Sequence, residues 1–240
     1  MPQTEPTLCE TPPRRGRLLV LLDYDGTITT RECNEIVLQR FTGDEWRRFE
    51  DAAQKGEIGH AECLDLQVGL LAVPRAAFFD AVVEAAEVAP GVGELLSGVA
   101  RSGARAVVVS AGFREAIEAV WRRDDLPPVG LYASELKGTG ENGGPPYRVA
   151  YSAAFGDCPT CGPGGCKGAL VDALREVGEA VAMFGDGLSD LCPARLADVV
   201  FAKSTLARLC ETEGIAYHRL DDYGRAWREL SAWLTVRPST

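Results

Sequence analysis

Long apolar runs and an excess of positive charge are both missing from this sequence. A membrane-spanning helix needs about 20 consecutive apolar residues, and no stretch of the 240-residue chain approaches that length. The 25 Lys and Arg residues are outnumbered by 35 Asp and Glu residues, which gives a net charge of −10 at pH 7. A surface of this sign argues against nucleic acid or an anionic membrane as a standing partner.

The N-terminal segment lacks the apolar centre of a signal sequence and is instead rich in Pro and Thr. We expect residues 1–16 to be disordered and the protein to be cytoplasmic. Hydrophobic residues make up 46% of the chain, which is enough for one core and a small second unit. The sequence has no apparent internal repeat, and we expect a monomer or a homodimer.

The most informative stretch is an apolar run, Leu18–Leu22, that ends in the sequence Asp23-Tyr24-Asp25-Gly26-Thr27. Side chains alternate between the two faces of a strand, so Asp23 and Asp25 start on the same side. Two converging carboxylates need a cation. Open sheets bind ligands beyond the carboxyl ends of their strands, where this pair lies, so Mg²⁺ and a phosphate are the expected ligands. A pair of this kind alone is more often a polar turn, so the assignment depends on further motifs.

Three such motifs follow along the chain. A second apolar strand ends in Ser110-Ala111-Gly112, a hydroxyl followed by small residues that leave backbone N–H groups accessible to an anion. Lys167 stands at the start of an apolar-periodic stretch. A third apolar strand ends in Gly185-Asp186-Gly187, with another acid, Asp190, four residues after Asp186.

In this order the four pieces resemble the motifs of the haloacid dehalogenase superfamily, which is dominated by Mg²⁺-dependent phosphatases. The resemblance covers the chain from about residue 17 to about residue 202. It implies an α/β fold, a Rossmann-like parallel sheet with helices on both faces plus a small inserted α-helical cap. It also implies Mg²⁺ as cofactor and a small phosphorylated metabolite as substrate.

The resemblance implies a role for each acidic residue. Asp23 attacks phosphorus and becomes an aspartyl phosphate, while Asp25 protonates the leaving oxygen and later deprotonates water. Asp23, the backbone carbonyl of Asp25, and Asp186 hold Mg²⁺. Asp190 is either a further metal ligand through water or the partner of Lys167.

The charges of these residue types suit the reaction. A phosphate monoester and four carboxylates crowd negative charge into one place, which cannot persist uncompensated at low dielectric. Mg²⁺ and Lys167 supply positive charge, and protonation of Asp25 removes one negative charge. The negative charge that remains can be stabilised by hydrogen bonds from Thr27, from Ser110 and from backbone amides at Ala111 and Gly112, which together form the expected phosphate-binding site.

The pattern of apolar residues predicts how the chain is organised. Residues 17–31 and 88–240 form the expected Rossmann-like core, and the mostly helical residues 32–87 form the expected cap over the site. Strands at 104–110, 180–184 and 199–202 alternate with helices, which predicts a parallel sheet. The predicted helices of the core are 94–102, 114–123, 169–177, 191–195 and 223–234, with short strands at 129–136 and 147–151.

Three of the eight cysteines, Cys158, Cys161 and Cys166, lie together just before Lys167. A zinc site would need four ligands, and neither His60 nor His218 is near in sequence. A disulfide and a tight Gly/Pro-rich loop of reduced thiols are the other interpretations, and we expect the loop. The remaining five are scattered and expected to be inert; they are Cys9, Cys33, Cys63, Cys192 and Cys210.

The cysteine-containing segment ending in Cys166-Lys167 resembles two phosphatase groups. One hydrolyses 2-hydroxy-3-keto-5-methylthiopentenyl-1-phosphate in methionine salvage, and the other hydrolyses phosphoethanolamine or phosphocholine. The opening motif and the residues after Val200 look most like the first group. We therefore expect a phosphoric monoester hydrolase of the first kind, with the second as an alternative.

Phosphoserine is a rival substrate, because phosphoserine phosphatases carry a glutamate nine residues after the nucleophile, where Glu32 stands. They also carry a cap arginine that pairs with the substrate carboxylate, and this chain has Gln67 there. An arginine elsewhere in the cap, at Arg47, Arg48 or Arg75, could restore that contact. Two other classes also remain open, a phosphotransferase and a non-catalytic binding protein. A dehalogenase would not need Asp25.

Overall fold

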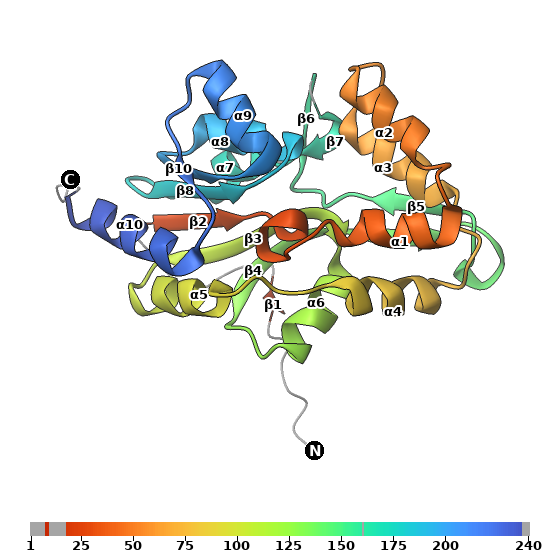
Figure 1. Ribbon diagram of the computed structural model, residues 1–240, viewed down its shortest axis with the longest axis horizontal. Helices are drawn as coiled ribbons and strands as arrows, with labels where there is room; N and C mark the ends of the chain where they lie inside the picture. Colours follow the sequence, from red (N-terminus) through yellow and green to blue (C-terminus); the bar gives the residue numbers. More distant parts are fainter. Residues whose placement is uncertain (1–7, 10–17, 160, 237–240) are drawn as a thin grey trace.

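The sheet at the centre of the molecule confirms the predicted α/β fold (Figure 1). The computed structural model describes residues 8–9, 18–159 and 161–236. Within these residues the main sheet has strand order β1-β4-β3-β2-β8-β9-β10, all pairs parallel, and β5 adds to β4 antiparallel. The strands are β1 (Leu8–Cys9), β2 (Leu18–Leu22), β3 (Arg105–Phe113), β4 (Val129–Gly138), β5 (Tyr147–Ala150), β8 (Ala180–Gly185), β9 (Val199–Ala202) and β10 (His218–Arg219).

Helices cover both faces of this sheet, and strand β2 shows why. Its side chains alternate, so Val20 packs into the core on one face and Leu19 and Leu21 pack into the core on the other. The first core is closed by α5 (Val92–Arg101), α6 (Arg114–Arg123) and α10 (Tyr223–Val236). The second is closed by α7 (Ala169–Leu174), α8 (Leu191–Leu196) and α9 (Ser204–Glu213).

Four helices occupy the predicted insertion between β2 and β3. They are α1 (Cys33–Thr42), α2 (Arg47–Gln54), α3 (His60–Gly69) and α4 (Arg75–Ala85). The two ends of the insertion are paired. The Thr30 N–H donates to the Glu87 carbonyl at 2.8 Å, and the Ala89 N–H donates to the Ile28 carbonyl at 2.8 Å. The insertion therefore leaves and rejoins the sheet at one place, close to the predicted boundaries at 32 and 87.

The structure differs from the sequence-based prediction in several segments. The predicted cysteine loop is an antiparallel hairpin of β6 (Gly156–Cys158) and β7 (Gly162–Cys166). Its Gly-rich sequence lacks the alternation of apolar and polar residues that predicts a strand. Strand β3 continues past Ser110 through a register shift against β4, and helix α7 ends at Leu174. No element was predicted where α9 and β10 lie.

Two residues of the N-terminal segment belong to the main sheet. Of the segment predicted to be disordered, residues 1–16, the structure describes Leu8–Cys9 as a strand paired with β4, so the prediction does not hold for these two residues. The other residues of the segment lie outside the described residues. Among the helices in the described ranges, none has the length and apolarity that crossing a membrane requires.

The contact between α5 and α10 gives a first testable prediction. A Cβ added at Gly98 would lie 2.7 Å from Cδ2 and Nε1 of Trp227, whereas one added at Gly93 in the same helix would meet only Leu126, at 3.8 Å. Overpacking of this kind costs about 1–3 kcal/mol, more than the roughly 0.5–1 kcal/mol that alanine gains over glycine in a helix. We expect Gly98→Ala to lower the free energy of unfolding in urea and Gly93→Ala to leave it unchanged or raise it. Equal effects of the two variants would contradict this packing.

Candidate active site

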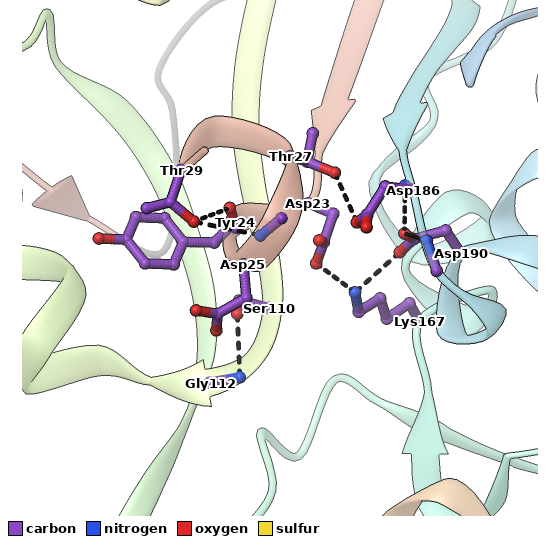
Figure 2. Close-up of polar contacts among 12 residues, drawn as sticks. Asp23, Tyr24, Asp25, Thr27, Thr29, Ser110, Gly112, Lys167, Asp186 and Asp190 are labelled. Atoms are coloured by element: carbon purple, nitrogen blue, oxygen red, sulfur yellow. Dashed lines mark hydrogen bonds and ion pairs between the residues drawn. The ribbon is translucent and has the colours of Figure 1, made fainter. Parts of the chain in front are cut away.

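The candidate site lies at the carboxyl end of three neighbouring strands (Figure 2). Asp23 follows β2, Ser110 lies near the end of β3, and Asp186 follows β8. Because β2 pairs with both β3 and β8, residues far apart in the chain meet at one edge. The Asp23 N–H donates to the Phe184 carbonyl at 2.9 Å and continues the β2–β8 pairing up to the site.

Lys167 joins two of the aspartates. Its Nζ donates to Asp23 Oδ1 at 2.5 Å and to Asp190 Oδ1 at 2.8 Å. Asp190 is held from its other oxygen, since Oδ2 accepts the N–H groups of Asp186 at 3.0 Å and of Gly187 at 3.1 Å. Lys167 is 1% exposed and Asp190 is 0% exposed. This triad therefore has a single arrangement, in which the ammonium points at the Asp23 carboxylate.

Asp186 and Glu32 face each other across Gly26. The Thr27 hydroxyl donates to Asp186 Oδ1 at 3.0 Å. A Cβ added at Gly26 would lie 2.6 Å from Asp186 Oδ2 and 2.7 Å from Glu32 Oε1. Gly26 also has a φ of +70°, which an L side chain rarely adopts. The glycine after Asp25 is therefore needed both for the turn and for the close approach of the two carboxylates.

Asp25 points toward Ser110 and away from the triad (Figure 2). Its Oδ1 accepts the Cys33 N–H at 3.2 Å, and its Oδ2 accepts Nδ2 of Asn34 at 3.0 Å. A Cβ added at Gly112 would lie 2.7 Å from Asp25 Oδ2 and 3.0 Å from Ser110 Oγ. The N–H of Gly112, a predicted phosphate-binding residue, donates to Ser110 Oγ at 2.9 Å.

The electrostatics of the site follow from burial and like charge. Burial raises the pKa of Asp23 well above its ordinary value, and the Asp190 and Asp186 carboxylates add to the rise. Burial raises the pKa of Asp25 and of Asp186 to about 6, and raises that of Glu32 to about 10 with help from Asp25 and Asp186. For Lys167, burial lowers the pKa, but Asp190 and Asp23 outweigh it and raise the pKa above its usual range. Burial and, at Asp23, Asp186 and Glu32, repulsion from neighbouring carboxylates thus favour the neutral form of these groups.

The donor set fits Mg²⁺. Carboxylate oxygens of Asp23, Asp186 and Asp190 lie within 4.8 Å of one another. Mg²⁺ binds oxygen ligands and is held by one or two carboxylates together with water and phosphate. Both oxygens of Asp190 already accept hydrogen bonds. Asp23 and Asp186, with Glu32 beside them, are therefore the groups best placed for direct contact with a cation.

Four residues near the site were not predicted as site residues. Lys203 Nζ donates to the Thr27 carbonyl at 3.5 Å, and the Tyr223 hydroxyl donates to the same oxygen. Asn34 holds Asp25. Burial lowers the pKa of His60, and nearby Lys167 lowers it further. Only Lys203 carried a usable signal, because it follows strand β9 at the same edge of the sheet.

Gln67 and the three arginines considered for substrate binding all have partners in the structure. Gln67 is buried and its Nε2 donates to Glu50 Oε2 at 3.3 Å. Each arginine that could replace it has another partner. Arg47 pairs with Asp44 at 3.1 Å, Arg75 pairs with Glu115 at 2.6 Å, and the Arg48 guanidinium lies 4.6 Å from the centre of the Phe49 ring.

No family model matches the chain, but individual proteins do. The 2-hydroxy-3-keto-5-methylthiopentenyl-1-phosphate phosphatase of Brevibacillus brevis is 26% identical over 196 residues, which is 81% of this chain and 86% of that protein. The bifunctional enzyme MtnB/MtnX of Bacillus licheniformis is 27% identical over 224 residues, which is 91% of this chain and 50% of that enzyme.

Solved structures are similar in fold. A phospho-aspartyl intermediate analogue of phosphoserine phosphatase has a TM-score of 0.65 at 18% identity, covering 91% of this chain and 99% of that one. Phosphoserine phosphatase from T. onnurineus, in complex with NDSB-201, has a TM-score of 0.65 at 19% identity, covering 95% and 99%. The first of these relatives is named as a phosphatase, and the solved structures share the fold, so both findings agree with the predicted resemblance to haloacid dehalogenase superfamily phosphatases.

The glycines on either side of Asp186 give a matched test of the site. A Cβ added at Gly185 would lie 2.7 Å from Cβ and Oδ2 of Asp190, whereas one added at Gly187 would lie 3.9 Å from Asp190 Oδ2. We expect Gly185→Ala to displace Asp190 and to lower the kcat for p-nitrophenyl phosphate roughly 10-fold or more. Each factor of ten corresponds to a rise of about 1.4 kcal/mol in the activation free energy. Gly187→Ala should retain most of the activity. Circular dichroism checks that both variants are folded, and equal kinetics in the two would refute the assigned crowding.

Proposed function

We propose that the protein is a Mg²⁺-dependent phosphatase that hydrolyses a small-molecule phosphate monoester through an aspartyl-phosphate intermediate. The observation that supports this best is the convergence of Asp23, Asp186 and Asp190 around the buried Lys167 ammonium. Four charged side chains kept together and largely out of water are costly to a fold. Such an arrangement is typical of a site that binds a charged group, here a phosphoryl group.

The first step is the attack of Asp23 on phosphorus. Lys167 donates to Oδ1 of Asp23, which leaves Oδ2 for the bond to phosphorus, and the P–O bond to the alcohol breaks as the new bond forms. Lys167 stabilises the negative charge of the transferring phosphoryl group, and Asp190 positions Lys167. The Ser110 hydroxyl, which the Gly112 N–H orients, binds the phosphoryl oxygens together with the backbone at Ala111. The Thr27 hydroxyl and the Gly112 N–H bind them when they exchange their present acceptors, Asp186 and Ser110, for the phosphoryl group.

Asp25 moves the protons in both steps. Its pKa of about 6 allows the protonated form to donate to the leaving alkoxide oxygen and the ionised form to take a proton from water. That water then attacks the aspartyl phosphate, which releases phosphate and regenerates Asp23. Asn34 and the Cys33 N–H position the Asp25 carboxyl group, which lies apart from the triad.

Asp23, Asp186 and the backbone carbonyl of Asp25 would hold Mg²⁺, with Asp190 behind them as the partner of Lys167. When bound, Mg²⁺ would offset the negative charge of the carboxylates and of the phosphate dianion. Glu32 adjoins this place through its contact with the Gly26 turn. Residues 32–87 act as a cap on the core, 17–31 and 88–240, and join it at the paired segments around Thr30 and Glu87.

The substrate we propose is 2-hydroxy-3-keto-5-methylthiopentenyl-1-phosphate or a phosphate ester like it, without a carboxylate. A phosphoserine carboxylate needs a guanidinium partner, and the arginines of the insertion named above are engaged elsewhere. The insertion also carries Glu35 and Glu50. Burial raises the pKa of Glu35, and repulsion from Glu50 adds to the rise. Acidic side chains here disfavour an anionic organic group. They leave phosphoethanolamine and phosphocholine as the second candidates.

The nucleophile assignment predicts the effect of Asp23→Asn. An amide oxygen does not form the acyl phosphate, so kcat should fall by several orders of magnitude while the fold is kept, as measured by phosphate release and circular dichroism. Brief reaction of the wild-type enzyme followed by acid quench should give a phosphorylated Asp23 peptide in mass spectrometry. Chelation with EDTA should abolish turnover and added Mg²⁺ should restore it. Retained turnover in Asp23→Asn would rule out the mechanism.

The substrate assignment predicts an order of kcat/KM values. We expect 2-hydroxy-3-keto-5-methylthiopentenyl-1-phosphate to exceed phosphoserine at least about tenfold, because no ion pair compensates the serine carboxylate. Phosphocholine and phosphoethanolamine complete the panel. A preference for phosphoserine would overturn the assignment, and a preference for phosphocholine would favour the second candidates. Phosphate release that requires an added alcohol acceptor would indicate a phosphotransferase.

A further inference from the structure

Four cysteines meet beside the candidate site, and we call them the four-cysteine cluster. They are Cys158, Cys161, Cys166 and Cys192. The first three are neighbours in the sequence, whereas Cys192 is one of the scattered cysteines that the sequence analysis predicts to be inert. In the structure Cys192, in helix α8, supplies the fourth sulfur that a zinc site needs and that the linear sequence did not reveal.

The spacing of the sulfur atoms suits one tetrahedral metal ion. The Sγ of Cys192 lies 3.8 Å from the Sγ of Cys158 and 3.8 Å from that of Cys161, and all four Sγ atoms lie within 4.8 Å of one another. Zinc–sulfur bonds of about 2.3 Å at tetrahedral angles place the sulfurs about 3.8 Å apart. A disulfide would need about 2.05 Å. A cluster of several iron and sulfide atoms would hold the thiolates farther apart than they are here.

The backbone around the cluster supports the same interpretation. The Cys161 N–H donates to Cys158 Sγ at 3.2 Å. A hydrogen bond of this kind stabilises and orients a thiolate ligand, as outer-shell partners of metal sites do. Cys161 and Cys166 are buried, whereas Cys158 and Cys192 are only partly buried, so an ion can enter from the side of the latter two.

We propose that the four-cysteine cluster binds a structural Zn²⁺ ion. Four protein thiolates fill a tetrahedral coordination sphere and leave no open position for catalysis, so the role is structural. The site is separate from the aspartate site that we assign to Mg²⁺, because zinc prefers thiolates and Mg²⁺ prefers carboxylates and water. The proposal does not depend on the proposed function.

The position of the cluster shows what the ion would hold together. Cys166 directly precedes Lys167, and Cys192 lies two residues after Asp190, so the ion would join the segments that carry this ion pair. The hairpin also contacts the insertion, since the Ala61 N–H at the start of α3 donates to the Cys161 carbonyl at 3.2 Å. Figure 1 shows β6 and β7 between α7, α8 and α9 on one side and α2 and α3 on the other. Zinc would therefore fix the Lys167–Asp190 pair relative to both the core and the insertion.

The test is the metal content of the full chain purified under reducing conditions without chelators. Elemental analysis of the wild type should give close to one zinc per chain, and Cys192→Ala and Cys161→Ala should reduce it to background. Cys210→Ala is the matched control, because Cys210 is buried in α9 outside the cluster and its loss should leave the zinc in place. Asp186→Asn should also retain the zinc, which separates this site from the catalytic one.

Two further measurements use only the wild type and so do not depend on whether the cysteine variants fold. Wild-type protein produced with Co²⁺ should show the intense visible bands of tetrahedral cobalt and the sulfur-to-cobalt charge transfer of thiolate ligands. Removal of zinc from the wild type should lower its thermal stability, and Zn²⁺ but not Mg²⁺ should restore it. Folded wild type without zinc, zinc lost in Asp186→Asn but kept in Cys192→Ala, iron in place of zinc, or disulfides among the four cysteines would each overturn the proposal.

Discussion

The ion pair network around Lys167 is the interaction on which the rest of the site depends. An ammonium that is 1% exposed persists only because Asp23 and Asp190 compensate it, and removal of one partner from such a buried set costs about 3–5 kcal/mol. Asp190 in turn keeps its position through the N–H groups of Asp186 and Gly187. The loop after β8 and the segment after β7 are therefore joined to the end of β2 by charge.

The aspartates of the site have different surroundings. Asp190 is satisfied by hydrogen bonds, whereas the pKa of Asp186 and of Asp23 is raised because burial and like charge are not balanced by sufficient positive charge. Asp25 points to the other side, where Asn34 and Cys33 hold it. One strand end thus presents two carboxyl groups to two different partners, which suits a nucleophile and a separate proton donor.

The helical insertion and the β6–β7 hairpin contact each other outside the main sheet. In the insertion, Gln67 donates a hydrogen bond to Glu50, and Glu50 lies near enough to His60 to influence its pKa. The hairpin packs against α3 and carries Lys167 at its end. A metal at the four-cysteine cluster would stiffen the connection through which the insertion and Lys167 are positioned together.

Much of this could be predicted from the sequence, because the motifs lie where local patterns are strong. Apolar runs such as Leu18–Leu22 end directly in acidic residues, and parallel strands bring such ends to one edge, so Asp23 and Asp186 were placed correctly at that edge. The hairpin was missed because Gly-rich strands show no alternation of apolar and polar residues. Cys192 and Asn34 were missed for a different reason. Their neighbours in space lie far away in sequence or around a turn, and only the folded chain decides which thiol completes a tetrahedron and which amide holds Asp25.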